Sequence, residues 1–116
     1  MSSYSDTEKG WVYLCKPEGK NVYKIGETIN LQRRFAEKQK KIDYKLILVA
    51  CIEVERELLY SVEYRLHETF KRYRLAGEWF ALPDSIQIEF LDYAKPAYEY
   101  EKNLAIARER LTHEQR

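Results

Sequence analysis

The sequence predicts a small α/β (α+β) domain in which a three-stranded, mainly antiparallel sheet is flanked by helices. Two stretches rich in aromatic and β-branched residues, 11–15 and 21–28, lie on either side of a Pro-Glu-Gly turn, a pattern typical of a β-hairpin. Apolar residues recur every three to four positions over residues 55–73, which is typical of an amphipathic helix. With 116 residues, of which 45% are apolar, the chain suits one domain with one modest core.

The first elements follow from local signals. The expected hairpin turns around Gly19, which can adopt a positive φ. Leu31 and Phe35 then recur at helical spacing, and Asn30 is a suitable N-cap, so a helix should begin near residue 30. The continuous apolar run over residues 46–52 predicts a third strand that is covered on both faces.

The second half of the chain should be mostly helical. The amphipathic helix over residues 55–73 should end before Gly77, and residues 79–81 should form a short extended piece. Pro83 can start another helix, which Pro96 should interrupt or kink. We therefore expect three parts: an N-terminal tail over residues 1–9, the domain over residues 10–95 and a helical appendage over residues 96–116.

The composition argues against a membrane-spanning, secreted or zinc-binding protein. The longest apolar run is too short to span a bilayer, and the N-terminus lacks the basic and apolar stretches of a secretory signal, so we expect a cytoplasmic protein. Cys15 and Cys51 both lie in apolar segments, which favours two buried thiols over a disulfide. Two thiols and two distant histidines give no zinc-site spacing.

The basic residues are unevenly distributed along the chain. Lys and Arg number 20 and Asp and Glu 19, so the net charge of +1 says little about an anionic partner. Residues 16–45, however, hold nine basic and four acidic residues. This density could meet a nucleic-acid backbone, although a solvated helix face would have the same composition.

Two short motifs carry a resemblance to a known family. Trp11-Val12-Tyr13 stands where the GIY-YIG nuclease superfamily has Gly-Ile-Tyr, and Lys24-Ile25-Gly26 stands where that family has Tyr-Ile-Gly. The chain most resembles the phage and bacterial branch whose second motif reads Tyr-Lys-Ile-Gly. That branch continues with Thr, an Asn-Leu helix start and an arginine, as residues 27–34 do here.

The resemblance extends downstream. The same branch carries a block of Glu, His, an aromatic residue and Gly-Glu-Trp-Phe, and this chain has Glu63, His67, Phe70 and Gly77-Glu78-Trp79-Phe80. The order and spacing of these blocks, which together cover roughly residues 10–82, make coincidence improbable.

The resemblance implies a set of catalytic residues for phosphodiester hydrolysis. Tyr13 is the candidate general base, and an ammonium at Lys24 across the hairpin would favour the phenolate, while partial burial would lower the pKa of Lys24. Lys24 could instead be the base itself or contact the phosphate. Arg34 follows Lys24 by ten residues, a spacing that favours Arg34 over Arg33 as the arginine that binds the scissile phosphate. Glu78 is the expected ligand of Mg²⁺ or Mn²⁺.

Two further residues are candidates with a structural alternative. His67 and Glu63 are four apart on one helix face and could bind a metal or each other, yet a histidine at helical spacing is more often structural. If His67 has a catalytic role, we expect it to position Tyr13 or a water molecule. Tyr23 should point to the other sheet face and pack in the core, although it remains an alternative catalytic residue.

Other basic residues are expected to contact flanking DNA. They are Arg33, Lys38, Lys40, Lys41, Lys71, Arg72 and Arg74. Lys38 lies one helical turn beyond Arg34, where related nucleases often carry histidine or tyrosine, so it is also a secondary catalytic candidate.

The sequence therefore leads us to expect a metal-dependent DNA endonuclease that acts by direct attack of an activated water, leaving a 5′-phosphate and a 3′-hydroxyl. The resemblance implies no covalent protein intermediate and a role in a bacterial or phage-infected cell. Because the sequence after residue 82 has room only for a helical appendage, we expect either a nicking or weakly selective enzyme, or one that forms a homodimer through this appendage to cut both strands. The alternatives are a non-catalytic nucleic-acid-binding module on the same scaffold and a protein-interaction domain with a vestigial site.

Overall fold

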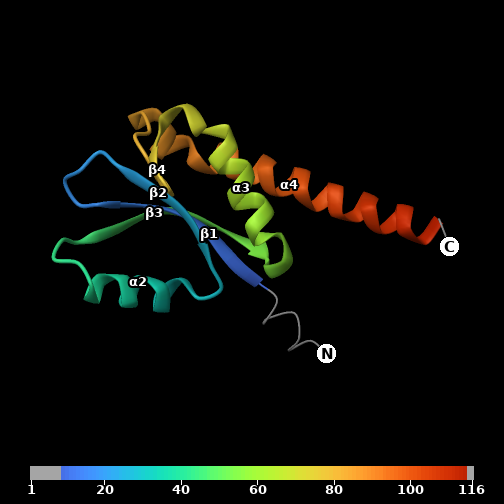
Figure 1. The fold of residues 1–116 in the computed structure, drawn as a ribbon, viewed down its shortest axis with the longest axis horizontal. Helices are drawn as coiled ribbons and strands as arrows, with labels where there is room; N and C mark the ends of the chain where they lie inside the picture. Colours follow the sequence, from blue (N-terminus) through green and yellow to red (C-terminus); the bar gives the residue numbers. More distant parts are fainter. Residues whose placement is uncertain (1–8, 115–116) are drawn as a thin grey trace.

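The computed structural model describes the backbone of residues 9–114 and the side chains of residues 9–113. Within this range the chain forms a mixed α+β domain with one antiparallel sheet of five strands and three α-helices (Figure 1). The strands are β1 (Lys9–Pro17), β2 (Tyr23–Thr28), β3 (Leu46–Glu55), β4 (Arg74–Ala76) and β5 (Trp79–Phe80). The α-helices are α2 (Leu31–Lys40), α3 (Leu59–Thr69) and α4 (Asp84–Glu114), and η1 (Arg56–Leu58) and η2 (Lys71–Tyr73) are single 3₁₀ turns. Apart from Lys9, the expected N-terminal tail lies outside the described residues, as do the last two residues of the appendage.

The sheet order is β3-β1-β2-β5-β4, so the expectation of three strands is wrong. The expected extended piece over residues 79–81 is β5, which pairs with β2 through Tyr23 and Lys24. β4 and β5 have only three and two residues, and Gly77 makes the turn between them with φ 56°. Strands this short are too brief to display an apolar alternation, so only their pairing in the folded chain defines them.

The β1–β2 hairpin forms as predicted, with a longer first strand and a second strand that begins two residues later than expected. Gly19 has φ 78°, which confirms the expected turn glycine. In the register of the hairpin, Tyr13 pairs with Gly26 and Cys15 pairs with Lys24. All four residues therefore lie on the same face of the sheet, because side chains alternate between faces along each strand.

β3 lies at an edge of the sheet and is paired with β1 alone. The expectation of a strand covered on both faces is wrong, because Val54 is the one fully buried residue of β3. A continuous apolar run indicates a tendency to be buried, but the position of the strand in the sheet decides how much cover it receives.

The core lies between one face of the sheet and the helices α3 and α4. α3 buries Leu59, Val62 and Leu66 against this face, and its apolar periodicity confirms the predicted amphipathic helix. The helix is shorter than expected, because η1 and η2 occupy its two predicted ends. The remaining core residues come from the strands, from α4 and from the segments that flank η2 and β5, and are Val12, Leu14, Tyr23, Ile25, Val54, Phe70, Phe80, Leu82, Ile86, Phe90, Ala94 and Ala97.

α4 continues through Pro96 to Glu114, so the expected interruption at this proline is wrong. Proline costs a helix one hydrogen bond and crowds the preceding turn. Ala94 and Ala97 are both buried on either side of Pro96, so packing against the core holds the helix together here. The predicted domain boundary at residues 95/96 falls inside this helix, whose last turns extend beyond the rest of the domain (Figure 1).

α2 covers the opposite face of the sheet from α3 (Figure 1). The side chain of Asn30 accepts a hydrogen bond of 3.0 Å from the Arg33 N–H, which confirms the predicted N-cap. None of the residues of α2 is buried. None of the described helices combines the length and apolarity needed to cross a membrane.

Candidate active site

Tyr13 lies on the face of the sheet that α2 covers. Its ring contacts the ring of Phe35 on α2 edge-on, with a centroid distance of 5.4 Å. The phenol reaches over Gly26 of β2, where a Cβ atom would lie 2.6 Å from the Tyr13 hydroxyl oxygen. Such a contact is impossible for ordinary atoms, so glycine at position 26 makes room for the tyrosine.

The Tyr13 hydroxyl is buried and has no hydrogen-bond partner among the described residues. Burial raises the pKa of the phenol, although the nearby charges of Lys24 and Arg34 act to lower this pKa. Lys24 favours the phenolate, as we expected, but the cost of burying a charge outweighs this attraction, so the pKa of Tyr13 is raised overall. Tyr13 therefore stays a neutral phenol at neutral pH.

Lys24 lies between a carboxylate and a second amine. Its amine is 3.6 Å from a Glu78 carboxylate oxygen, and the Lys24 side chain is 13% exposed. Burial lowers the pKa of Lys24, but interactions with the Lys38 amine, Tyr13 and Glu78 together raise it. The expected net lowering of this pKa is wrong, because these interactions favour the charged amine more than burial disfavours it.

The partner amine, Lys38, shows the opposite shift. Its hydrogen-bonding interaction with Lys24, its own partial burial and the positive charges of Lys24 and Arg34 lower the pKa of Lys38 to about 8. Two neighbouring ammonium groups repel each other, so one of the pair loses its proton much more readily than an isolated lysine. A cavity of about 130 Å³ adjoins both amines and is also lined by Cys15, Lys41 and Trp79.

The backbone of Glu78 is hydrogen-bonded to β2, just before β5 begins. Its carbonyl oxygen accepts a hydrogen bond of 3.1 Å from the Ile25 N–H, while its side chain is 48% exposed. Glu63 on α3 lies close enough that burial and the charges of Glu78 and Glu27 raise the pKa of Glu63 to about 7. Like-charged carboxylates at one place suit a hard divalent cation, which would relieve their repulsion.

The fit to a cation is nevertheless loose. In the part of the chain that the structure describes, no three His, Cys, Asp or Glu side chains come together as a metal-binding group. Glu78 is then the protein ligand that the arrangement offers, with Glu63 and Glu27 as negative charges nearby. Such a site would fit Mg²⁺, which keeps several water ligands and relies on substrate phosphate oxygens.

His67 and Tyr23 both support the site from the core side of β2. The Nε2 atom of His67 is 2.9 Å from the Ile25 carbonyl oxygen, and the imidazole packs edge-on against Phe80 at a centroid distance of 5.0 Å. His67 therefore contacts the backbone of β2 at Ile25, the residue whose N–H bonds to Glu78. It makes no hydrogen bond to Tyr13 or Glu63. Tyr23 is completely buried in the core on the face opposite to Lys24, which matches the expectation for its direction.

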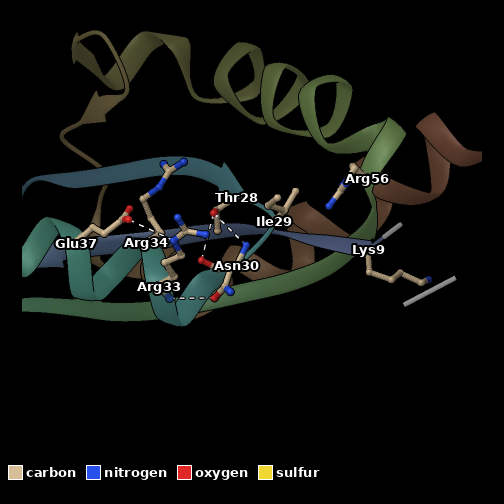
Figure 2. Close-up of a pocket in the computed structure, with 8 residues that line it drawn as sticks. All are labelled: Lys9, Thr28, Ile29, Asn30, Arg33, Arg34, Glu37 and Arg56. Atoms are coloured by element: carbon tan, nitrogen blue, oxygen red, sulfur yellow. Dashed lines mark hydrogen bonds and ion pairs between the residues drawn. The ribbon is translucent and has the colours of Figure 1, made fainter. Parts of the chain in front are cut away.

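Arg33 and Arg34 diverge from neighbouring positions on α2. Arg34 is half-buried and extends past β2, close enough to lower the pKa of Tyr13 (Figure 2). The Nε atom of Arg33 instead lies 3.3 Å from a Glu37 carboxylate oxygen, and the Arg33 side chain is 75% exposed. The structure thus brings Arg34, and not Arg33, to the phenol.

The remaining basic residues expected to contact DNA are dispersed. Lys41 lines the small cavity beside Lys38, whereas Lys40 is exposed on α2. Three others have local partners: Lys71 lies 3.7 Å from Glu68, Arg72 lies over the Tyr73 ring at 5.4 Å, and Arg74 donates a hydrogen bond of 2.7 Å to the Gly77 carbonyl.

Sequence reasoning missed three charged residues near this cluster. Glu27 directly follows the Gly26 motif position, and this adjacency was the signal that could have found it. Lys9 and Arg56 lie on either side of a groove that reaches Arg34, but they are far apart in sequence and no motif links them.

The fold and the clustered side chains define a small α+β domain with a charged cluster around Lys24 of the central strand β2. Comparison with protein families gives a match to the T5orf172 domain over residues 10–96. This match covers most of the chain, so the protein belongs to the T5orf172 domain family. No curated protein and no solved structure matches the chain.

Proposed function

We propose that the protein is a metal-dependent DNA endonuclease of the GIY-YIG type. One observation carries this proposal: Tyr13, Lys24, Arg34 and Glu78 come from four separate segments and gather around Lys24 on the central strand β2. A phenol, an amine, a guanidinium and a carboxylate are the groups that phosphodiester hydrolysis requires. T5orf172 domains occur in phage and bacterial nuclease-like proteins, which supports the same reading.

Each residue has a role that its surroundings support. The planar guanidinium of Arg34 can hold two oxygens of the scissile phosphate. A divalent cation bound by Glu78 would neutralise charge on the phosphate and on the departing oxygen. Lys24, paired with Glu78 at 3.6 Å, would orient that carboxylate and contact the phosphate. The products would be a 5′-phosphate and a 3′-hydroxyl.

Within this proposal, Lys38 is a better proton acceptor than Tyr13. The Tyr13 hydroxyl is buried and its pKa is raised, so it is poorly suited to take a proton at neutral pH. Lys38 lies in the same cluster on the accessible side of Lys24 and borders the small cavity. Its neutral amine would accept the proton of the attacking water, and Tyr13 would act as a hydrogen-bond donor in the site.

The test is cleavage of supercoiled plasmid by the purified protein with Mg²⁺, with Mn²⁺ or with EDTA. Arg34→Ala and Glu78→Ala should abolish nicking, and Gln32→Ala, an exposed position on α2 that lies outside the groove that reaches Arg34, serves as the control on the same helix. Thermal unfolding of each variant checks that the fold is kept. The proposal fails if the wild type and both variants leave the plasmid equally intact with either metal, on a substrate set that includes DNA of varied sequence.

A second candidate function is a nucleic-acid-binding module without catalysis. The buried Tyr13 hydroxyl and the pairing of Glu78 with Lys24 favour this alternative, because neither group is free to act without rearrangement. Salt-sensitive DNA binding with no metal-dependent cleavage would select this function, and absence of both would leave a protein-interaction domain.

A further inference from the structure

A basic groove opens at the end of the sheet where β1 begins and β2 ends. The cavity has a volume of about 400 Å³ and lies between the start of α2 and η1 (Figure 2). Four of its lining side chains are cationic, namely Lys9, Arg33, Arg34 and Arg56, and one, Glu37, is anionic. The groove therefore gathers positive charge from three separate elements in a protein whose net charge is only +1.

Two of these cations are already paired with carboxylates and two are not. Arg33 lies 3.3 Å from Glu37, and Lys9 lies 3.3 Å from Glu55. Neither Arg34 nor Arg56 forms a salt bridge with any side chain of residues 9–113. Two guanidinium groups thus face the groove with their charge uncompensated by the protein.

The start of α2 adds to the positive character of the groove. Asn30, which caps the helix, lines the groove, and no acidic residue occupies the first turn of α2. The partial positive charge of a helix N-terminus therefore remains available to an anion here. This contribution supplements the four cationic side chains and does not replace them.

The groove is continuous with the proposed active site through Arg34, which lines the groove and also reaches Tyr13. We infer that the basic groove binds the phosphates of the DNA strand next to the scissile phosphate, with Arg56 and Arg34 as the contact residues. This inference rests on the proposed function and adds the direction in which the substrate strand leaves the site.

The other basic cluster is a weaker candidate for the same role. Lys71 and Arg74 are each engaged by local partners, and Arg72 lies over an aromatic ring. A volume of about 400 Å³ also exceeds what one free phosphate would fill, whereas a chain of phosphates would use cations placed along the groove. The expected ligand is therefore a polymer backbone rather than a single anion.

The test measures DNA binding without cleavage. Fluorescence anisotropy of a labelled duplex of about 30 base pairs is recorded in EDTA over roughly 50–300 mM KCl, for the wild type, Arg56→Gln and Arg72→Gln. The logarithm of the affinity falls linearly with the logarithm of the salt concentration, and each phosphate contact adds about 0.9 to the steepness of that fall. Arg56→Gln should therefore make the line shallower by about that amount. It should also weaken binding roughly threefold or more at the upper salt concentrations. Arg72→Gln, an exposed arginine elsewhere on the surface, should change neither quantity.

Further variants make the result decisive. Arg56→Lys should retain most of the affinity because it keeps the charge, and Lys9→Gln should reduce the slope less than Arg56→Gln because Lys9 is already paired with Glu55. An unchanged slope in Arg56→Gln, or an equal loss in Arg72→Gln, overturns the groove assignment even if the wild type cuts plasmid and Arg34→Ala does not. Absence of any DNA binding by the wild type overturns the groove and the proposed function together.

Discussion

Val12 and Leu14 of β1 face α3 and α4, whereas Tyr13 and Cys15, which alternate with them, face α2. All four side chains are completely buried, yet they lie in different surroundings. The first pair packs in an apolar core, and the second pair lies beside Lys24 and its charged neighbours. One strand therefore serves stability with one face and polar chemistry with the other.

The helices on the two faces differ in the same way. α3 buries Leu59, Val62 and Leu66, whereas α2 buries none of its residues and carries Arg33, Arg34 and Lys38. A helix that contributes little apolar area to the core is free to present cations to a ligand. We therefore expect changes on the α2 side to affect activity, and changes on the α3 side to affect the free energy of unfolding.

After the loss expected from Arg34→Ala and Glu78→Ala, the next largest effect on activity should come from Lys38→Arg. Arginine keeps the positive charge but does not release its proton at accessible pH. The wild-type nicking rate should rise as pH increases through the Lys38 pKa of about 8, because the neutral amine is the acceptor. The variant should lose this rise and about 10²-fold to 10⁴-fold of the rate, with an unchanged melting temperature.

The measurement is single-turnover plasmid nicking across the pH range, with Lys40→Arg as the control on the same helix. Lys40 is exposed and should tolerate the change. An Arg variant at position 38 that keeps the wild-type pH profile would exclude Lys38 as the acceptor.

The largest effect on stability should come from Leu66→Ala on α3. Leu66 is completely buried, so truncation should lower the free energy of unfolding by about 2–5 kcal/mol, measured by urea denaturation. Nicking below the unfolding transition should persist. Leu48→Ala on the edge strand β3 is the control, since Leu48 is 41% exposed. Equal losses from both variants would contradict the division between the two faces.

A pH-dependent effect of intermediate size is expected from Glu63→Gln. Burial and nearby carboxylates raise the pKa of Glu63 to about 7 in the folded protein, compared with about 4.3 in an unfolded chain. The folded state therefore binds the proton more tightly, so the wild type loses stability as pH rises between these two values. Replacement by the neutral amide should raise the free energy of unfolding by about 1–3 kcal/mol near pH 8 and by almost nothing near pH 4.

Urea denaturation at the two pH values tests this prediction, with Glu89→Gln, exposed on α4, as the control. A gain of equal size at both pH values would show that Glu63 is not destabilised by its charge.

The smallest change in the free energy of unfolding is expected when either of two buried tyrosines is replaced by phenylalanine. The hydroxyls of Tyr13 and Tyr23 are both buried without a hydrogen-bond partner among the described residues, one on each face of the sheet. Replacing either with Phe removes an unsatisfied polar group, so the free energy of unfolding should stay equal or rise by about 1 kcal/mol. Only Tyr13→Phe should reduce nicking. A matching loss of activity in Tyr23→Phe would mean that the core face also takes part in catalysis.

Much of the fold could be predicted because its signals are local. Gly19 and Asn30 act within a few residues of their own positions, and both behave as predicted. β4 and β5 were not predicted as strands of the sheet, because pairing with β2 defines them. The continuity of α4 through Pro96 was also missed, since burial of the flanking alanines outweighs a local penalty.

The residues of the candidate site also divide into those that local sequence signals predict and those that only the tertiary structure brings together. The spacing of Tyr13, Lys24 and Arg34 was readable because a hairpin and the following helix bring these residues together. Lys9 and Arg56 carry no motif, and only the return of β3 alongside β1 brings them to one groove.

The sequence by itself determined which side chains share a face of β1 and β2, where the hairpin turns and where α2 begins, because alternation, turn sterics and capping act over a few residues. The tertiary structure alone decided the number of strands, the uninterrupted α4 and the direction of the pKa shifts at Tyr13 and Lys24. Those shifts are a balance between burial and charge, and the charges come from the hairpin itself, from Arg34 and Lys38 on α2, and from Glu78 in the turn before β5.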